Sequence, residues 1–261
     1  MKNKLIAWLV CMAVTQSLIA QKDPQQDSIF KEAAKTELWK PVPLKVTPGQ
    51  TNSDAPSDAI ILFNGTDTKS WQKTDGTEPG WKIDAQGVLN VVKGSGSIQT
   101  KEAYGSCQLH IEWKSPAEIA GEGQTRGNSG VYLMGRYELQ ILDAYNNPTY
   151  VNGQAGSIYK QHIPLVNAAK KPGEWQSYDV VFTAPVFSAD GVLQDSARFT
   201  VFHNGVLIQN NVKVKGSVEW IGLPSYKAHK KKEQLMLQDH GFDGGNPVAF
   251  RNIWIRPLRY L

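Results

Sequence analysis

Short runs in which apolar and polar residues alternate make up most of the chain after residue 58. They are rich in β-branched and aromatic residues and are separated by glycine, proline and asparagine, as expected of strands joined by turns. The pattern shows no long amphipathic helix in this region and no repeat of fixed period, and it predicts an all-β sandwich or barrel. The predicted strands are residues 59–63, 80–84, 87–92, 97–100, 107–114, 129–134, 137–143, 177–185, 197–204, 205–214, 234–240 and 248–258.

The strongest signal for a tight turn is the pair Asn204 and Gly205, which lies between two alternating runs in FTVFHNGVLIQ. A two-residue hairpin turn needs positive backbone angles, and asparagine and glycine adopt these most readily. We therefore assign the pair a structural role rather than a role in ligand binding.

Residues 1–20 have the pattern of an export signal. A lysine-bearing start is followed by an apolar run, too short to span a bilayer permanently, and by a small residue at Ala20. We expect cleavage near Ala20 and a periplasmic, cell-surface or secreted protein. Lipoprotein processing at Cys11 is the alternative, which Val10 disfavours because such sites prefer a small residue there. Residues 21–57 are predicted to be an extension and linker with a short helix within 28–39, and residues 58–261 the main domain.

Net charge gives little indication of a charged partner. The formal charge falls from +4 to +2 when the signal is removed, because Lys2 and Lys4 are lost and no acidic residue is. So small a surplus implies neither a nucleic-acid partner nor a membrane partner. Cys107 is then the one remaining cysteine, and its alternating surroundings predict a buried core residue rather than a nucleophile. The basic run at 229–232 is expected to be a solvated loop.

Polar side chains interrupt the strand YELQILD in a regular way. Glu138 and Gln140 share one face by the two-residue alternation of a strand, and Tyr137, Leu139 and Ile141 share the other. A carboxylate beside an amide suits a sugar-binding site, because an amide both donates and accepts hydrogen bonds. The alternative is a solvated sheet face on which Glu138 pairs with Arg136 or Lys160.

The same residues also permit a conventional retaining glucanase. Glu138, Gln140 and Asp143 have the spacing of the strand motif E-x-D-x-x-E, in which two carboxyl groups lie about 5 to 5.5 Å apart. Here the middle residue is an amide, and Asp143 falls on the opposite face unless a bulge intervenes. The departure disfavours direct double displacement.

Two further segments supply candidate site residues. In LQDHG, His240 lies at the end of a predicted strand and shares a face with Gln238, so it is a candidate base or metal ligand, or a histidine that caps the strand. In RGNSG, Asn128 and Ser129 either contact a sugar or shape a turn, and Arg126 is a candidate for holding an anionic intermediate or a surface residue.

Loops contribute two aromatic candidates. Tyr159 lies in GQAGSIYKQ, where a phenol could donate a proton to a departing oxygen. Trp220 lies beside a loop that contains Gly222 and Pro224, and it is the tryptophan best placed to stack against a sugar ring. The other tryptophans considered are expected mainly in the core, and they are Trp81, Trp113, Trp175 and Trp254.

The order of these motifs resembles the 3-keto-disaccharide hydrolase family of exported bacterial domains, from Ile60 to the C-terminus. The resemblance implies a concanavalin-like jelly roll of two antiparallel sheets with a concave sugar-binding face. The motifs that carry it are LFNGTD (62–67), GNSGVYLMGRYELQILD (127–143), GQAGSIYKQ (153–161), NAAKKPGEWQSYDVVF (167–182), HNGVLIQN (203–210), LQDHG (237–241) and FRNIWIRPL (250–258).

The resemblance implies a glycoside whose ring carbon 3 is oxidised to a ketone. Such a ketone acidifies the hydrogen on carbon 2, so a base can start an elimination that expels the glycosidic oxygen from carbon 1. We expect His240, Glu138 and Tyr159 to be catalytic and Gln140, Asn128, Ser129, Arg126, Gln238 and Trp220 to bind substrate. If a divalent cation takes part, Glu138 and His240 are its candidate ligands. A lectin-like module without catalysis is the alternative, because this fold also serves carbohydrate-binding proteins.

Overall fold

The computed structural model describes residues 24–241 and 247–258, so the export signal predicted for residues 1–20 lies outside the described residues. The chain divides into two compact units, and the second begins at Lys45. The first contains helix α1 (Pro24–Ala34). This helix begins and ends earlier than the predicted range. It begins at Pro24 because proline is well suited to a first helical turn. In the described ranges, no helix is long and apolar enough to cross a membrane.

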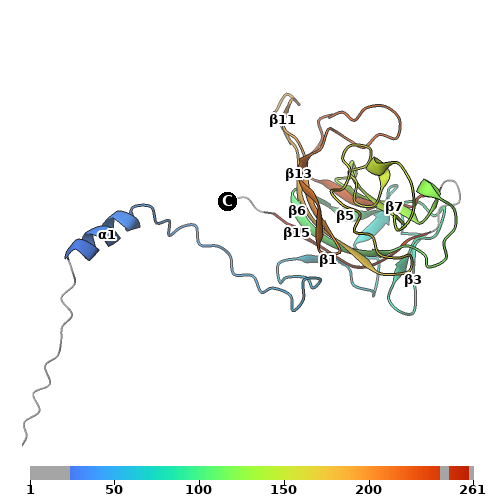
Figure 1. Ribbon diagram of the computed structural model, residues 1–261, viewed down its shortest axis with the longest axis horizontal. Helices are drawn as coiled ribbons and strands as arrows, with labels where there is room; N and C mark the ends of the chain where they lie inside the picture. The colour runs from blue at the N-terminus through green and yellow to red at the C-terminus, as the bar shows by residue number, and fades with distance from the viewer. Residues whose placement is uncertain (1–23, 242–246, 259–261) are drawn as a thin grey trace, which may run out of the picture. The chain divides into compact units, whose positions relative to one another are not determined.

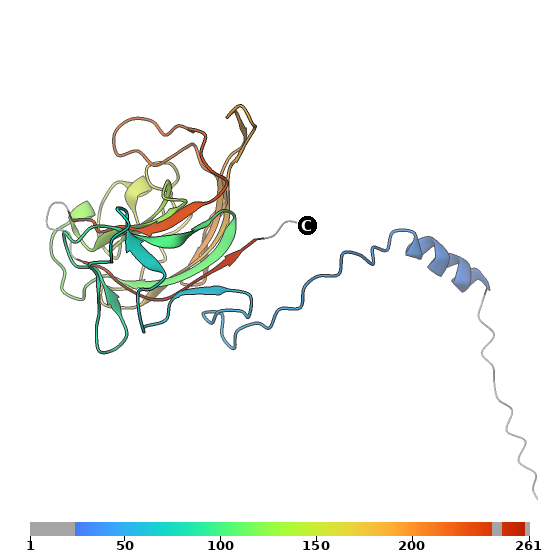
Figure 2. The same cartoon turned by 180° about the vertical axis from the view of Figure 1, so that it is seen from behind.

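The second unit, here called the β-domain, contains two large antiparallel sheets (Figures 1 and 2). This arrangement confirms the predicted jelly-roll sandwich. Across the larger sheet the strands are β13 (Val206–Lys213), β12 (Arg198–His203), β9 (Gln176–Thr183), β6 (Cys107–Lys114), β15 (Ala249–Pro257), β4 (Leu89–Asn90) and β3 (Lys82–Ile83), with β1 (Ile60–Phe63) also paired to β15. Across the smaller sheet they are β2 (Trp71–Lys73), β5 (Ile98–Tyr104), β14 (Glu233–Leu237), β7 (Asn128–Leu133) and β8 (Tyr137–Leu142).

The core forms from the alternate residues that each strand turns inward. On β6 these are Cys107, Leu109, Ile111 and Trp113, all fully buried. The inward residues of the neighbouring β9 include Tyr178, whose ring lies 5.5 Å from that of Trp113. Burial raises the pKa of the Cys107 thiol to about 12, which agrees with a core residue and disfavours a nucleophile.

Short strands and strand ends account for the main differences from the predicted elements. The sequence did not indicate β2 or the small hairpin of β10 (Val186–Phe187) and β11 (Leu193–Asp195). Strand β14 ends at Leu237, whereas the pattern predicted a strand to residue 240. Beyond it the backbone N–H of Gln238 still donates to Gly130 O, whereas the backbone N–H of Asp239 donates to the side chain of Ser97 and not to a strand backbone.

The Asn204–Gly205 pair forms the predicted turn between β12 and β13, with φ angles of 52° and 80°. The side chain of Asn204 donates to Ala168 O at 2.8 Å and accepts from the backbone N–H of Ser177 at 3.0 Å. The structural role predicted for this pair is confirmed.

The outward face of the larger sheet buries an ionic cluster. His110 on β6 is 1% exposed, its Nδ1 lies 2.6 Å from Asp179 Oδ1, and its ring stacks on Trp254. Residues before β1 cover this face, since Ser53 O accepts hydrogen bonds from Asn252 and Trp254. Burial alone would lower the pKa of His110, but hydrogen bonds to Asp179 and Glu112 raise it to about 9.

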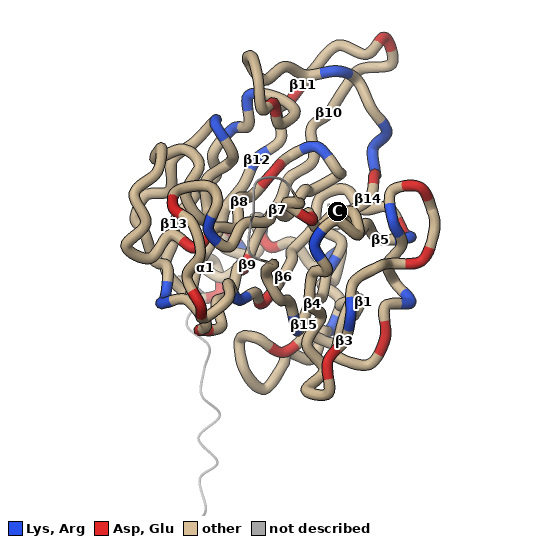
Figure 3. The backbone as a smooth tube through the Cα atoms, turned by 90° about the vertical axis from the view of Figure 1, so that its right-hand side faces the viewer, with Lys and Arg blue, Asp and Glu red and all other residues tan. Residues whose placement is uncertain are grey.

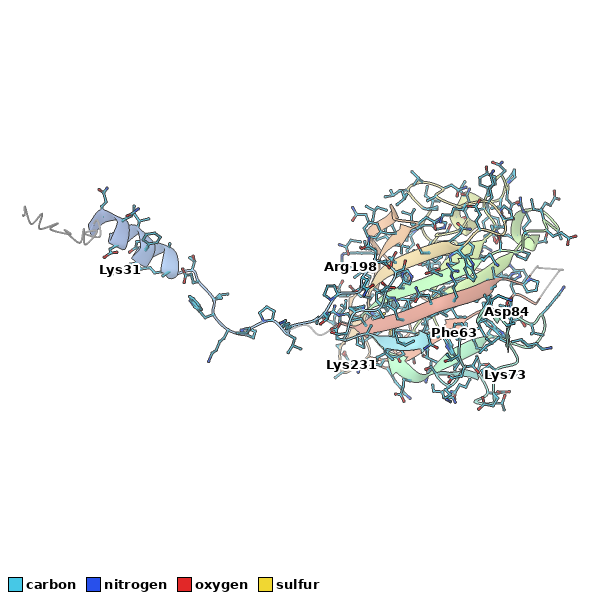
Figure 4. The ribbon with its side chains drawn as sticks, turned by 90° about the horizontal axis from the view of Figure 1, so that it is seen from below. Lys31, Phe63, Lys73, Asp84, Arg198 and Lys231 are labelled. Atoms are coloured by element: carbon cyan, nitrogen blue, oxygen red, sulfur yellow. The ribbon has the colours of Figure 1, made fainter. Side chains whose placement is uncertain are left out.

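Charged residues of both signs are interspersed over the β-domain (Figure 3). Figure 4 shows Lys231, in the basic run, toward one end of this domain and Lys73 and Asp84 toward the other. Lysines 230 to 232 are exposed, but the His229 ring is mostly buried, with its Nε2 2.7 Å from Tyr137 Oη. The basic run therefore has an exposed lysine part and a buried histidine.

Candidate functional site

One face of the smaller sheet carries polar side chains that are almost completely buried. Register pairs Tyr132 with Glu138, Gly130 with Gln140 and Asn128 with Leu142, so these positions share one face of β7 and β8. The other face contributes Tyr137, Leu139 and Ile141 to the core, as the alternation predicted. A cavity of about 860 Å³ lies over the polar face. Its lining residues are Ser97, Gln124, Thr125, Asn128, Tyr132, Glu138, Gln140, Tyr150, Tyr159, Val218, Trp220, Gln238, Asp239 and His240.

Gly130 leaves space at the middle of this face. A Cβ atom at position 130 would lie 2.6 Å from Glu138 Oε1 and 2.7 Å from Tyr132 Cε2. Both distances are shorter than contacts between non-bonded atoms allow. A glycine inside a strand therefore permits the close approach of Glu138 and Tyr132 to the backbone.

Glu138 is 4% exposed, and its carboxyl group titrates far from its ordinary range. Burial raises its pKa to about 8, and the hydrogen bond with Tyr132 offsets part of that effect. The solvated ion pair that we considered for Glu138 is not formed. Arg136 Nε instead donates to Glu233 at 2.6 Å, and Lys160 Nζ to Trp220 O at 2.6 Å.

Two amide side chains beside Glu138 are held by Gln124. Asn128 Nδ2 donates to the backbone oxygen of Gln124 at 2.8 Å. Gln140 Nε2 donates to Gln124 Oε1 at 3.1 Å and to Gly153 O at 3.3 Å. The amide oxygens of Asn128 and Gln140 are buried and have no hydrogen-bond partner among the described residues.

The segment after β14 completes the polar wall. The backbone N–H of Gln238 donates to Gly130 O at 3.1 Å, so Gln238 lies beside the middle of β7. Its Nε2 bonds Tyr132 Oη at 3.0 Å. His240, two residues further on, also lines the cavity. Glu138 on β8 and His240 in the segment after β14 thus line one pocket.

Ser129 and Arg126 do not line the cavity. Ser129 is fully buried on the opposite face of β7, where its Oγ donates to Gln238 O at 2.7 Å. Arg126 is 6% exposed and forms an ion pair with Asp143. Ser129 Oγ and Arg126 Nη2 bind protein groups and neither residue lines the cavity, so the contacts with sugar expected of both stay a prediction.

The Arg126 ion pair also bears on the glucanase alternative. Asp143 is 3% exposed, and its carboxylate binds Arg126 and the backbone N–H of Tyr145. It does not line the cavity that contains Glu138. A second carboxyl group in the position required for double displacement is therefore not supplied by Asp143.

Two tyrosines and a tryptophan lie at the cavity wall outside the sheet. Tyr150 Oη and Tyr159 Oη are 2.7 Å apart, and burial raises the pKa of both phenols. Lys160 Nζ lies 5.8 Å and 5.7 Å from the two ring centroids. Trp220 is 75% exposed, so it offers an open aromatic surface beside the polar interior.

The other tryptophans lie elsewhere. Trp81, Trp113 and Trp254 are buried, as expected. Trp175 is only partly buried, and its ring contacts Lys114 and Arg251.

Seven lining residues were not among the sequence candidates, and three of them, Tyr132, Gln124 and Tyr150, bind candidate residues. Tyr132 lies in an apolar strand and was not singled out in the sequence, although its pairing with Glu138 places it on the Glu138 face. Gln124 and Tyr150 belong to loops without periodic patterns. Only the aromatic character of Tyr150 offered a signal in the sequence.

This pocket offers few side chains that could coordinate a metal ion. Within residues 24–241 and 247–258, no group of three or more His, Cys, Asp or Glu side chains is arranged to hold one. Glu138 and His240 remain the residues that would contribute first to such a site.

Comparison with known proteins agrees with a carbohydrate-related site. A candidate glycosyl hydrolase from Parabacteroides distasonis is 50% identical, with a TM-score of 0.82 over 86% of this chain and 95% of that one. A second from the same organism is 22% identical, with a TM-score of 0.57 over 82% and 100% of the two chains, which shows a shared fold. No curated protein matches the chain.

The family comparison is more specific. The family model described as a 3-keto-alpha-glucoside-1,2-lyase-like domain matches residues 58–256. This range contains the whole polar cavity. Together with the related structures, it supports a carbohydrate-active function. The chain belongs to the 3-keto-alpha-glucoside-1,2-lyase-like domain family.

Proposed function

We propose that the protein is an exported enzyme that cleaves 3-keto-glycosides by removing the proton on carbon 2 and eliminating the glycosidic oxygen. The observation that carries the proposal is the buried carboxyl of Glu138, with a pKa near 8, in an amide-lined cavity of a chain from this family. A carboxylic acid that stays neutral at neutral pH can donate a hydrogen bond to an oxygen that gains negative charge.

The reaction begins with proton transfer. His240 accepts the proton from carbon 2, and the electrons of that C–H bond form an enediolate across carbons 2 and 3. The neutral carboxyl of Glu138 and the hydroxyl of Tyr132 stabilise the charge on the keto oxygen. Burial of both groups strengthens these hydrogen bonds, because the surrounding dielectric is low.

Elimination follows as the ketone re-forms. The electrons then create a double bond between carbons 1 and 2, and the bond from carbon 1 to the glycosidic oxygen breaks. Tyr159 protonates the departing oxygen, since it lies at the cavity wall together with Tyr150 and the exposed Trp220. Addition of water across the new double bond gives net hydrolysis, whereas release before that step gives a lyase.

The direct test is incubation of the purified protein with 4-nitrophenyl 3-keto-glucoside, with the unoxidised glucoside as control. We expect release of nitrophenol and an unsaturated keto-sugar from the oxidised compound alone. The assay is repeated with a chelator and with added divalent cations. Absence of release under every metal condition would refute the enzymatic proposal.

A carbohydrate-binding module without catalysis is the second candidate. The exposed ring of Trp220 beside buried amides favours it, because such a combination also suits sugar recognition alone. Calorimetry with the same oxidised glucoside separates the two candidates, since binding without product formation supports the module.

A further inference from the structure

Gln124 joins three segments around the cavity. It lies in a short 3-10 turn, η1 (Gly123–Thr125), and its Nε2 donates to Thr149 Oγ1 and to Gly153 O, each at 3.0 Å. Its Oε1 accepts from Gln140, and its backbone oxygen accepts from Asn128. Every polar atom of this side chain is therefore engaged by the protein.

These bonds fix the orientation of two amides in the cavity wall. Asn128 and Gln140 are 4% and 2% exposed, and the nitrogen of each amide donates to an oxygen of Gln124. If either amide turned over, two oxygens would face each other and both would lose a donor. Asn128 Oδ1 and Gln140 Oε1 are consequently the buried acceptors of two residues that line the cavity, and neither has a partner among the described residues.

Two buried acceptors without partners are unfavourable unless a ligand supplies donors. The hydroxyl groups of a sugar are donors, whereas a ketone oxygen can only accept. A ketone oxygen at this wall would be a third acceptor beside Asn128 Oδ1 and Gln140 Oε1, and none of the three could donate a hydrogen bond. The wall thus distinguishes an oxidised carbon from the hydroxyl-bearing carbons of the same ring.

We propose that Asn128 and Gln140 form a hydroxyl-recognition subsite, with Gln124 as the residue that fixes its polarity. This inference rests on the proposed function, because it assumes that a keto-sugar occupies the cavity. The subsite binds unoxidised hydroxyls and directs the ketone toward Glu138 and Tyr132. Gln124 is a positioning residue that sets substrate orientation.

The test compares methyl 3-keto-glucoside with its 4-deoxy and 6-deoxy analogues. For the parent protein we expect kcat/KM to fall about tenfold to a hundredfold for at least one analogue, as for a lost buried hydrogen bond. In Gln124→Leu the amides can rotate, so we expect the ratio between substrate and analogue to shrink to about threefold or less. Equal rates for all three sugars in the parent, or an unchanged ratio in Gln124→Leu, would overturn the inference.

Matched variants separate orientation from folding. Gln154→Leu changes the same residue type at a partly exposed position outside the cavity lining and should preserve the ratio. If Gln124→Leu does not fold, Thr149→Val takes its place. It removes the hydrogen bond from Gln124 Nε2 to Thr149 Oγ1 and should reduce the ratio. A full ratio in that variant counts against the subsite.

Binding measurements distinguish this inference from the proposed reaction. If none of the three sugars is cleaved, calorimetry with the same sugars shows whether the subsite binds them. Binding that weakens when one hydroxyl is removed supports the subsite and refutes cleavage. Cleavage of all three at equal rates supports the reaction and refutes the subsite.

Discussion

Glu138 shows how a single residue can contribute to a site at a cost to stability. In the unfolded chain its carboxyl titrates near 4.5, and in the folded chain burial raises the pKa to about 8. A raised carboxyl pKa gives a stability contribution that is full below pH 4.5 and is lost as the pH rises through 8. The ionised form is therefore unfavourable where it is buried.

The first prediction is that Glu138→Gln stabilises the fold at alkaline pH. An amide carries no charge to bury, so the variant should melt several degrees above the parent at pH 9 and close to it at pH 5. Thermal unfolding followed by circular dichroism at the two pH values checks this. A variant that is less stable at pH 9 would contradict the assignment of Glu138 as a desolvated carboxyl.

The second prediction concerns the pH profile of the reaction. If neutral Glu138 stabilises the enediolate, kcat/KM falls as the pH rises through about 8. Glu138→Gln should lower kcat by roughly a hundredfold and remove that alkaline fall, because an amide does not titrate there. Initial rates with 3-keto-glucoside between pH 5 and 10 measure both effects. An alkaline fall that persists in the variant would assign it to another group.

The third prediction is that Gly130→Ala disrupts the site. The new methyl group would meet Glu138 Oε1 and Tyr132 Cε2, so the carboxyl must move. We expect activity to fall at least tenfold, with a loss of about 1 to 3 kcal/mol in the free energy of unfolding. Rates and denaturant unfolding on the same preparation check it. Unchanged activity would show that the position of Glu138 is not critical.

For single residues, the sequence predicted the sheet face on which a side chain lies better than the groups to which that side chain binds. The alternation in YELQILD was sufficient to place Glu138 and Gln140 together on the face opposite Leu139. It could not show that Asp143 binds Arg126, since that ion pair joins residues on either side of a hairpin. Nor could it identify Gln124, whose role depends on contacts with Thr149 and Gly153 in another loop.

At the scale of elements, the hairpin between β12 and β13 depends on Asn204 in a left-handed conformation. The fourth prediction is that Asn204→Ala destabilises the β-domain by about 1 to 3 kcal/mol, since it adds backbone strain and removes three side-chain hydrogen bonds. Denaturant unfolding measures the change. Asn210→Ala, at an exposed strand position, is the control and should have little effect.

Strand length decided which elements could be predicted. Strands such as β6 and β9 have eight residues each, enough for a clear alternation. Strand β10 has two residues and β11 has three, which is too few for a period to be visible. The end of β14 could not be predicted either, because the Ser97 hydroxyl to which the backbone N–H of Asp239 donates lies far from it in the sequence.

At the scale of the whole molecule, the ionic cluster on the outward face adds a second dependence of stability on pH. His110 titrates near 6.5 when unfolded and near 9 when folded. Its contribution is therefore full below pH 6.5 and lost as the pH rises through 9. Glu138 changes stability in the same direction over a neighbouring range.

The fifth prediction is that the melting temperature falls between pH 6 and 10 and that His110→Gln reduces this fall. Activity at pH 7 should remain for the folded variant, because His110 lies on the larger sheet and does not line the cavity. Scanning calorimetry across the pH series measures the first effect, and initial rates measure the second. An identical pH dependence in parent and variant would contradict the role of His110.

The position of β15 affects how the β-domain can assemble. This strand follows every other described strand in the sequence, yet it pairs with β1, β4 and β6 within the larger sheet. A chain that emerges from a ribosome or a translocation pore therefore leaves that sheet unfinished until β15 is free. Contacts between such distant parts of a sequence form slowly. A slow-folding chain remains unfolded for longer, which suits the proposed export by a route that carries unfolded chains across a membrane.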